Sequence, residues 1–155
     1  MRLWRLSSER RARDFDGGYG LFNDGRWNTR GRPLTYCSTA PSLAALERRV
    51  HVNDPSLLPA QILVTYELPE NISRRTIEIG ALPADWTMRQ THTQSIGDRW
   101  LDSMTEALLF VPSVIVPIAS VPDLNVLINH RHAAAQSIRV ADLTPFTLDP
   151  RLFSP

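Results

Sequence analysis

Apolar and polar residues alternate along several short segments of the chain, which is the pattern of strands with one buried face. The alternation is longest at residues 61–68, where every second residue from Ile62 to Leu68 is apolar or aromatic. Residues 34–38 repeat it over a shorter length. Further strands are expected at residues 3–6, near 75–79, at 107–111 and near 138–140.

A proline interrupts the longest apolar stretch. Pro112 and Ser113 stand between the apolar runs 107–111 and 114–118. Because proline lacks the N–H that a central strand needs, we expect a strand end or a bulge at this point. Ser113 is then held at an edge or opening of the sheet.

The longest helical pattern begins at Pro41, since proline fits the first turn of a helix, where its missing N–H has no partner to lose. An apolar stripe follows, and Leu43, Glu47 and His51, spaced by four residues, fall on the stripe beside it. Glu47 is therefore expected at the border between core and opening. Shorter helices are expected at residues 82–86, at 97–101 behind a cap at Thr93 or Ser95, and from Ala133.

The number and order of these elements predict the fold class. Strands outnumber helices, which favours an α+β fold with a mixed sheet core and short flanking helices. A chain of 155 residues with 43% hydrophobic residues can build one core of ordinary size. We therefore expect a single domain over residues 1–155.

Composition excludes several kinds of chemistry and partner. All 17 residues counted as lysine or arginine are arginine, so lysine Schiff bases and lysine-tipped phosphate loops are excluded. A net charge of +1 gives no reason to expect direct nucleic-acid or membrane binding. Cys37 is the only cysteine, residues 1–5 lack the apolar core of a secretory signal, and no apolar run could span a bilayer. A cytoplasmic protein is expected.

Candidate chemistry gathers in the first third of the chain. A loop bounded by Gly25 and Gly31 carries Arg26, the following strand carries Tyr36, and the helix carries Glu47. Loop, strand and helix can bring a guanidinium, an aromatic ring and a carboxylate to one cleft. These groups suit a ligand that is anionic, aromatic and cleaved through a cationic transition state.

Short motifs in a fixed order cover nearly the whole chain. They are Arg26-Trp27-Asn28 with Gly31, Tyr36, Leu46-Glu47 with His51, Gly97-Asp98, Trp100-Leu101, Val111-Pro112-Ser113, Asn125 to Asn129, and Asp149-Pro150-Arg151. In this order and spacing the chain resembles the RES domain family, which is named for an arginine, a glutamate and a serine. The resemblance assigns these three to Arg26, Glu47 and Ser113, and makes Tyr36 the tyrosine that shares their pocket.

The resemblance also implies a fold and a function. The fold would be related to that of ADP-ribosyltransferases, and the activity would be degradation of NAD by phosphorolysis or hydrolysis. The protein would be the toxin of a bacterial toxin-antitoxin pair, and its partner a helix-turn-helix DNA-binding antitoxin that covers the active site. NAD is then the substrate, inorganic phosphate is a candidate co-substrate, and no cofactor is expected. A homodimer within the complex is left open.

The three family residues suit this chemistry. Arg26 can bind the pyrophosphate of NAD through paired, charge-assisted hydrogen bonds. The nicotinamide is already a pyridinium and leaves without being protonated, so one carboxylate suffices. Glu47 would hold the ribose hydroxyls and stabilise the oxocarbenium-like charge. Ser113 has no nearby base in the sequence pattern, so we expect it to bind a phosphate or ribose oxygen rather than to attack.

Five further residues are expected to bind the substrate. Trp27 and Tyr36 offer π faces to the nicotinamide or adenine ring, and Asn28 and Asn125 belong to the matching motifs. His51 follows Glu47 by one helical turn. It is either the hydrogen-bond partner of that carboxylate or a satisfied, partly buried histidine.

One late segment departs from the family. Val126 and His130 stand where relatives usually carry an aromatic residue and a proline, so stacking by this segment is not expected and its backbone is less restricted. His130 and His132 are spaced like a metal-binding pair. No cysteine or acidic cluster accompanies them, so no metal is expected.

Two other classes of function stay open at this stage. The first is an ADP-ribosyltransferase that modifies a protein or a nucleic acid, which transfer of label from NAD to a macromolecule would reveal. The second is a non-catalytic binding module or an RNA-cleaving toxin that uses histidines as acid and base.

Overall fold

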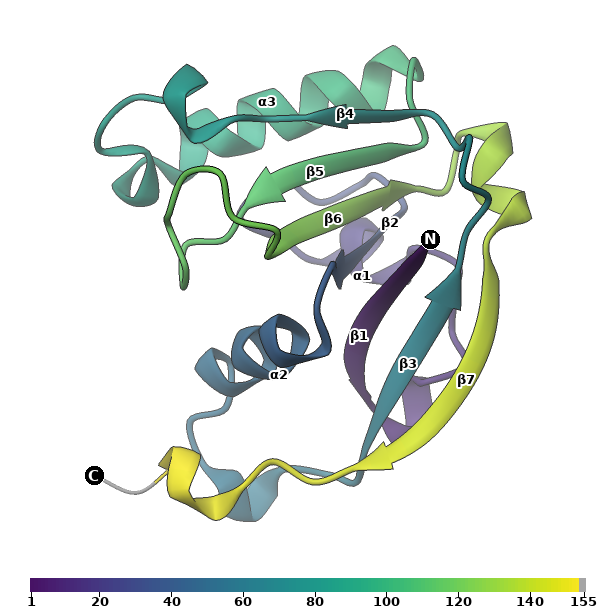
Figure 1. Ribbon diagram of the computed structural model, residues 1–155, viewed down its shortest axis with the longest axis vertical. Helices are drawn as coiled ribbons and strands as arrows, with labels where there is room; N and C mark the ends of the chain where they lie inside the picture. Colours follow the sequence, from purple (N-terminus) through teal and green to yellow (C-terminus); the bar gives the residue numbers. More distant parts are fainter. Residues whose placement is uncertain (154–155) are drawn as a thin grey trace.

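The computed structural model describes residues 1–153, apart from the side chain of Ser56, and over this range the strands form one seven-stranded sheet (Figure 1). The strands are β1 (Arg2–Ser8), β2 (Leu34–Ser38), β3 (Gln61–Glu67), β4 (Arg74–Thr76), β5 (Leu108–Pro112), β6 (Leu124–Asn129) and β7 (Arg139–Phe146). Their order is β4-β5-β6-β2-β1-β3-β7. β4 and β5 are parallel, and the other neighbouring pairs are antiparallel. The predicted α+β class with a mixed sheet is confirmed.

Helices are few and short over the same residues. The α-helices are α1 (Gly18–Phe22), α2 (Pro41–Val50) and α3 (Gln90–Ser103). The 3-10 turns are η1 (Glu9–Arg11), η2 (Pro55–Leu57), η3 (Ile79–Ala81), η4 (Trp86–Met88), η5 (Ala133–Ser137) and η6 (Pro150–Phe153). Within residues 1–153, none of the helices combines the length and the apolar character that crossing a membrane requires.

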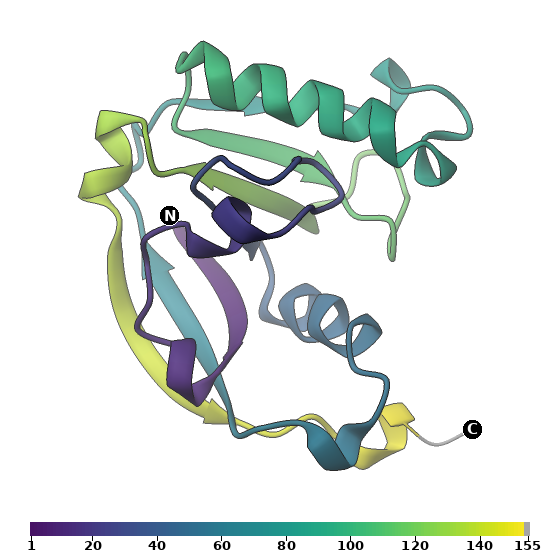
Figure 2. The same ribbon diagram turned by 180° about the vertical axis from the view of Figure 1, so that it is seen from behind.

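The sheet divides into two halves where β1 meets β2. β1 pairs with β3 along its whole length, but within the described residues it meets β2 at one register pair, Trp4 opposite Ser38. In Figures 1 and 2 the axes of β4, β5, β6 and β2 are roughly aligned, while β1, β3 and β7 curve away at an angle to them. α3 covers the first half, and α2 lies against β1 and β2 beside the junction.

One apolar cluster joins the two halves. It contains Leu108 and Ile128 of the first half and Leu3 and Val64 of the second, all with no exposed surface. Their burial stabilises the packing of one half on the other, although few backbone hydrogen bonds cross the junction.

A second apolar cluster lies under α3. Thr93, Gly97, Trp100 and Leu101 are buried at helical spacing, so one stripe of α3 faces the sheet. Trp100 and Leu101 pack with apolar residues of β5 and β6 and with Trp27. α3 thereby holds the loop that contains Trp27 against the sheet.

Most elements agree with the sequence pattern. The strands predicted at residues 3–6, 34–38, 61–68, 75–79, 107–111 and 138–140 are confirmed, within a few residues, as β1, β2, β3, β4, β5 and β7. α2 begins at Pro41, as predicted, and Pro112 is the last residue of β5, which confirms the predicted strand end. The helix expected from Ala133 is the 3-10 turn η5.

Helix α3 begins earlier than predicted. Its first residue is Gln90, so a cap at Thr93 or Ser95 is wrong. Thr93 lies inside the helix, where its hydroxyl donates to the carbonyls of Arg26 and Gln90. Residues 97–101, as predicted, are helical.

Three other segments also differ from the prediction. Residues 18–22, for which no helix was predicted, form α1, which packs so closely beside β2 that a Cβ at Gly20 would lie 2.3 Å from the carbonyl oxygen of Arg32. The helical turn expected at 82–86 lies later in the chain, as η4 from Trp86, and η3 precedes the expected segment. Residues 124–129, for which no strand was predicted, form β6.

Candidate active site

The turn that carries Arg26 is closed by its own backbone and pinned to β2. The Gly25 N–H donates to the carbonyl of Asn28 at 2.9 Å. The Tyr36 hydroxyl accepts a hydrogen bond from the Trp27 N–H at 3.0 Å and donates one to Asn28 Oδ1 at 2.9 Å. A Cβ on Gly25 would lie 2.4 Å from Asn28 Oδ1 and 2.6 Å from the Tyr36 hydroxyl, so the turn requires glycine here.

Helix α3 holds the same turn from the other side. Thr93 Oγ1 donates to the Arg26 carbonyl at 2.6 Å, and Gln94 Nε2 donates to the Gly25 carbonyl at 2.9 Å. A Cβ on Gly97 would lie only 1.8 Å from the carbonyl oxygen of Trp27. The missing side chain lets α3 touch the turn, which is thus held between α3 and β2.

The guanidinium of Arg26 is half-buried and only partly engaged. Within residues 1–153 it makes one hydrogen bond, from Nη1 to the Thr87 carbonyl at 3.0 Å. An arginine carries five N–H donors, so the others are available to an anion. Its position on a rigid turn favours paired contacts to a phosphate or pyrophosphate.

Tyr36 is the support of this turn. Burial raises the pKa of Tyr36 well above its usual range, and nearby acidic groups including Glu47 act in the same direction. The phenol therefore stays protonated and keeps its donor role toward Asn28. The exposed ring of Tyr19 packs edge-on against it, with ring centroids 5.9 Å apart and an interplanar angle of 89°.

Helix α2 brings Glu47 to the ends of β5 and β6. Glu47 Oε1 accepts a hydrogen bond from Ser113 Oγ at 2.9 Å and another from Asn125 Nδ2 at 2.5 Å. Among the residues described, none forms a hydrogen bond with Oε2. One carboxylate oxygen is therefore anchored, and the other is available to a ligand.

Strand β2 links the carboxylate to the arginine turn. Tyr36 contacts the turn, and Ser38, two residues later on the same face of the strand, donates to Asn125 Oδ1 at 3.0 Å. Ser38 and Asn125 are also register partners. Two residues of a strand span about 7 Å, so the β2 residues that support the two parts of the candidate site are neighbours on one face of the strand.

Ser113 is engaged with the carboxylate. It is fully buried, and besides donating to Glu47 its Oγ accepts a hydrogen bond from the Ile115 N–H at 3.0 Å. In this arrangement the hydroxyl holds Glu47, whereas the sequence suggested a contact to a phosphate or ribose oxygen.

Two residues expected to bind the substrate support the turn instead. The Trp27 side chain is 1% exposed and its ring lies 6.1 Å from that of Trp86, so it has no open face for a ligand. Asn28 is fully buried, and its amide donates to the carbonyls of Asn23 and Thr29. The expected stacking on Trp27 is wrong for this arrangement because the indole belongs to the core under α3.

His51 lies apart from the carboxylate. α2 ends at Val50, and His51 follows as an exposed cap residue with no hydrogen bond to Glu47 among the described residues. It borders a hollow of about 280 Å³ together with Arg48 and Leu58. Ser113 and Asn125 orient the carboxylate instead. α2 ends at Val50, so His51 does not continue the helical spacing that would have placed it beside Glu47.

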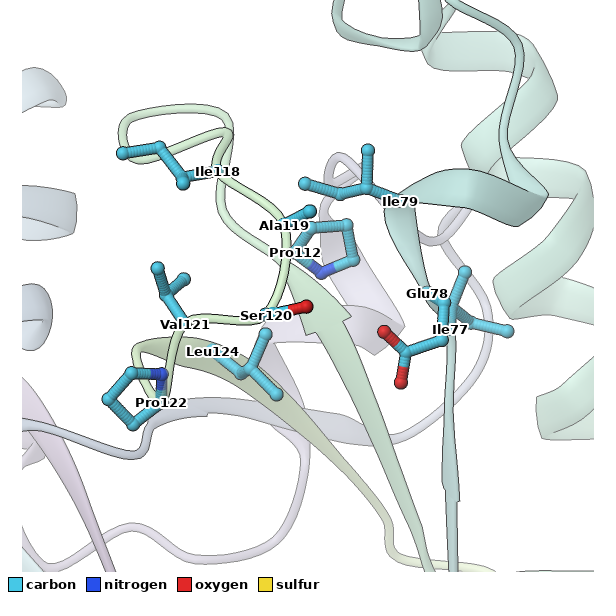
Figure 3. A pocket seen from close by; sticks show the side chains of 10 residues that line it. All are labelled: Ile77, Glu78, Ile79, Pro112, Ile118, Ala119, Ser120, Val121, Pro122 and Leu124. Atoms are coloured by element: carbon cyan, nitrogen blue, oxygen red, sulfur yellow. The ribbon is translucent and has the colours of Figure 1, made fainter.

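A larger hollow of about 430 Å³ lies where β5 ends and β6 begins (Figure 3). It is lined by Ile77, Glu78, Ile79, Pro112, Ile118, Ala119, Ser120, Val121, Pro122 and Leu124. Pro112 and Leu124 directly precede Ser113 and Asn125 and are register partners. Since successive side chains of a strand point to opposite faces, this hollow opens on the face away from Asn125.

The two late histidines have internal roles. His130 Nε2 lies 2.8 Å from Thr35 Oγ1, and His132 Nδ1 accepts a hydrogen bond from the Ala134 N–H at 3.1 Å. Residues 1–153 contain no group of three or more histidine, cysteine, aspartate or glutamate side chains placed to hold a metal ion.

Three residues that shape the site were not predicted from the sequence to have a functional role. Gly97 stood in a motif, and a glycine inside a helix signals close backbone approach, so this one could have been found. Thr93 was interpreted as a cap. Ser38 had no signal beyond its place on a strand, because its partner lies 87 positions away.

Comparison with known proteins gives full-length matches. The sequence model of the RES domain family matches residues 2–149. Toxin Res of Pseudomonas putida is 40% identical over 157 residues, which cover 99% of this chain and 100% of that protein. A Sphingobium protein named Prs ADP-ribosylating toxin is 35% identical over 157 residues, which cover 97% of this chain and 95% of that protein.

A solved structure shares the fold. The match is to the M. tuberculosis MbcT-MbcA toxin-antitoxin complex, with a TM-score of 0.67 and 18% sequence identity over 98% of this chain and 86% of that one. At this identity the likeness concerns the fold alone. The family match over residues 2–149 and the full-length identity to its members show that this chain belongs to the RES domain family.

Proposed function

We propose that this protein is the toxin of a toxin-antitoxin pair and that it degrades NAD by cleaving the bond between nicotinamide and ribose. The observation that carries the proposal is the Glu47 carboxylate, anchored through Oε1 and free at Oε2, beside the strand that supports the Arg26 turn. The full-length likeness to proteins named as toxins supports the biological role.

Arg26 binds and orients the substrate in this proposal. Its bond to the Thr87 carbonyl fixes one edge of the guanidinium, and the unengaged N–H groups face an anion. A pyrophosphate accepts such paired donors well. The turn is held by α3 and β2, so little ordering of the protein is needed when the dinucleotide binds.

Glu47 stabilises the charge that develops as the bond breaks. The electron pair of the carbon–nitrogen bond goes to the pyridinium nitrogen, so nicotinamide leaves neutral and without a proton. Positive charge then spreads over the anomeric carbon and the ring oxygen of the ribose, where Oε2 of the fixed carboxylate stabilises it. An oxygen of phosphate or water next bonds to the anomeric carbon, and water gives its proton to the solvent.

Product analysis tests the proposal directly. Folded protein free of antitoxin is incubated with NAD, with and without inorganic phosphate, and the products are separated. Hydrolysis yields nicotinamide and ADP-ribose, whereas phosphorolysis yields nicotinamide and phosphorylated ADP-ribose. NAD that stays intact in both reactions would refute the proposal.

A second candidate function is transfer of ADP-ribose to a macromolecule. The name of the Sphingobium relative, an ADP-ribosylating toxin, supports this alternative. Incubation with NAD labelled in its adenylate group, together with cell extract, separates the two activities. Label that moves into protein or nucleic acid would favour transfer, and label that stays in small molecules favours degradation.

We also propose an antitoxin partner with a helix-turn-helix DNA-binding domain that covers the active site in the cytoplasm. The structural neighbour is a toxin in complex with its antitoxin, which supports a partner of this kind. Co-expression with the product of the adjacent gene, followed by light scattering, tests for the complex and for a homodimer within it. NAD turnover that persists in the purified complex would count against a covered site.

A further inference from the structure

A chain of hydrogen bonds crosses β2 and β6 and ends on the Glu47 carboxylate. Ser38 Oγ donates to Asn125 Oδ1 at 3.0 Å, and Asn125 Nδ2 donates to Glu47 Oε1 at 2.5 Å. Ser113 Oγ donates to the same oxygen at 2.9 Å. The carboxylate is thus approached by two donors, and one of them is itself held by a third side chain.

The direction of this chain follows from the chemistry of its groups. An amide accepts only through its oxygen and donates only through its nitrogen, whereas a hydroxyl can do either. Because Ser38 donates to Oδ1, the NH2 group of Asn125 is turned toward Glu47. The opposite orientation would place Asn125 Oδ1 against the carboxylate oxygen of Glu47, so the carboxylate sets the orientation of the amide, and the Ser38 hydroxyl stabilises it by donating to Oδ1.

Burial makes the Ser38 hydroxyl hard to replace by water. Its side chain is 3% exposed, and Ser38 lies opposite Trp4 at the junction of the two half-sheets. A hydrogen bond shielded from solvent is stronger than one at the surface, and an unpaired buried group is correspondingly costly. The amide orientation is therefore fixed by the fold before any ligand arrives.

We propose that Ser38 and Asn125 are positioning residues that aim Oε2 of Glu47 at the anomeric carbon of the substrate. This inference rests on the proposed cleavage of NAD, and it gives Asn125 a role in holding the carboxylate rather than the ligand. The aimed charge acts as the carbon–nitrogen bond breaks, so loss of aim lowers kcat and leaves KM nearly unchanged.

The experiment compares Ser38→Ala with the conservative Ser38→Thr, which keeps the hydroxyl. Ser38→Ala is expected to lower kcat on NAD on the order of tenfold, the rate equivalent of one hydrogen bond, with KM changed less than about twofold. Ser38→Thr is expected to retain most of the wild-type kcat. Ser137→Ala is the matched control, because Ser137 is an exposed serine whose hydroxyl donates to the Ala134 carbonyl, and its kcat should equal that of the wild type.

Asn125→Asp provides a second, nearly isosteric test that does not depend on the folding of the Ser38 variants. It replaces the donor with a second carboxylate facing Glu47, and kcat should fall on the order of 100-fold with KM retained. Wild-type kcat in Ser38→Ala or in Asn125→Asp would overturn the inference, as would equal losses in Ser38→Ala and Ser38→Thr. Wild-type protein that leaves NAD intact would overturn the proposed function, and this inference with it.

Discussion

The Arg26 turn and the Glu47 carboxylate are held by different forces. The turn is enclosed by close backbone contacts, with Gly97 of α3 against the Trp27 carbonyl and the Tyr36 hydroxyl beneath it. The carboxylate is held by hydrogen bonds from side chains on β5, β6 and their neighbours, without such steric closure. The turn is therefore part of the folding core, whereas the carboxylate cluster can lose its function while the fold persists.

Gly97→Ala is expected to have the largest effect. The added Cβ would lie 1.8 Å from the Trp27 carbonyl oxygen, so α3 or the turn must move. We expect a loss of about 3 kcal/mol in the free energy of unfolding, together with loss of NAD cleavage because Arg26 is displaced. Thermal denaturation should show Tm lower by about 6–12 °C for a domain of this size.

Gly80→Ala is the matched control for that change. A Cβ at Gly80 would meet no atom within 4 Å, so its free energy of unfolding should stay within about 0.5 kcal/mol of the wild type. An equal Tm for the Gly97 and Gly80 variants would break the comparison, because the turn would then not be enclosed by α3.

Glu47→Gln should separate activity from stability. Glutamine keeps the shape of the side chain and an oxygen that can accept from Ser113 and Asn125, but it lacks the charge that stabilises the transition state. We expect NAD cleavage to fall by at least about 100-fold while Tm stays within about 3 °C of the wild type. A drop in Tm as large as that of Gly97→Ala would mean that the carboxylate also belongs to the folding core.

Tyr36→Phe sharpens the comparison at the point where the two regions meet. The change removes the hydroxyl that accepts from the Trp27 N–H and donates to Asn28 Oδ1, and leaves both groups buried without that partner. We expect a loss of about 1–2 kcal/mol in the free energy of unfolding, measured by urea denaturation. An increase in stability would show that the phenol serves a ligand and not the turn.

The sequence predicted the scaffold of the site better than its contacts. Strands β1, β2 and β3 follow local alternation, and the start of α2 and the end of β5 are marked by Pro41 and Pro112. Local periodicity and proline geometry act over a few residues, so they can be recognised without the fold. Loop position, helical spacing and the proline break had already pointed to Arg26, Glu47 and Ser113, and the family resemblance then assigned all three to one pocket.

The roles that were not predicted from the sequence depend on how distant parts of the chain pack. Trp27 was expected to stack on a ligand, but α3 buries it, and that packing depends on a helix about 70 residues away along the chain. His51 has the spacing of a partner for Glu47, yet the helix ends before it. Ser38 meets Asn125 only because β2 and β6 are neighbours in the sheet. None of these three outcomes is encoded in a local pattern.

The smallest expected effect is a pH dependence of the free energy of unfolding, which arises from His130 beside β2. His130 packs against Phe15 and lies 2.8 Å from Thr35 Oγ1, and burial lowers the pKa of His130 below its ordinary value of 6.5, although Asp16 acts in the opposite direction. The unfolded chain therefore takes up the proton at a higher pH than the folded one. This stabilising contribution is present above pH 6.5 and is lost as the pH falls below that value.

His130→Gln should therefore flatten the pH dependence of stability. Because His130 is partly exposed, the change in the free energy of unfolding between pH 7.5 and pH 5.5 should shrink by less than about 1 kcal/mol. Urea denaturation of wild type, His130→Gln and the control His92→Gln, which changes an exposed histidine of α3, measures the difference. His130 contacts Thr35, whose side chain points to the face of β2 opposite that of Ser38, so NAD cleavage at pH 7.5 should be unchanged. A lowered kcat at that pH would show that β2 couples this histidine to the carboxylate, which would then not be independent of the rest of the sheet.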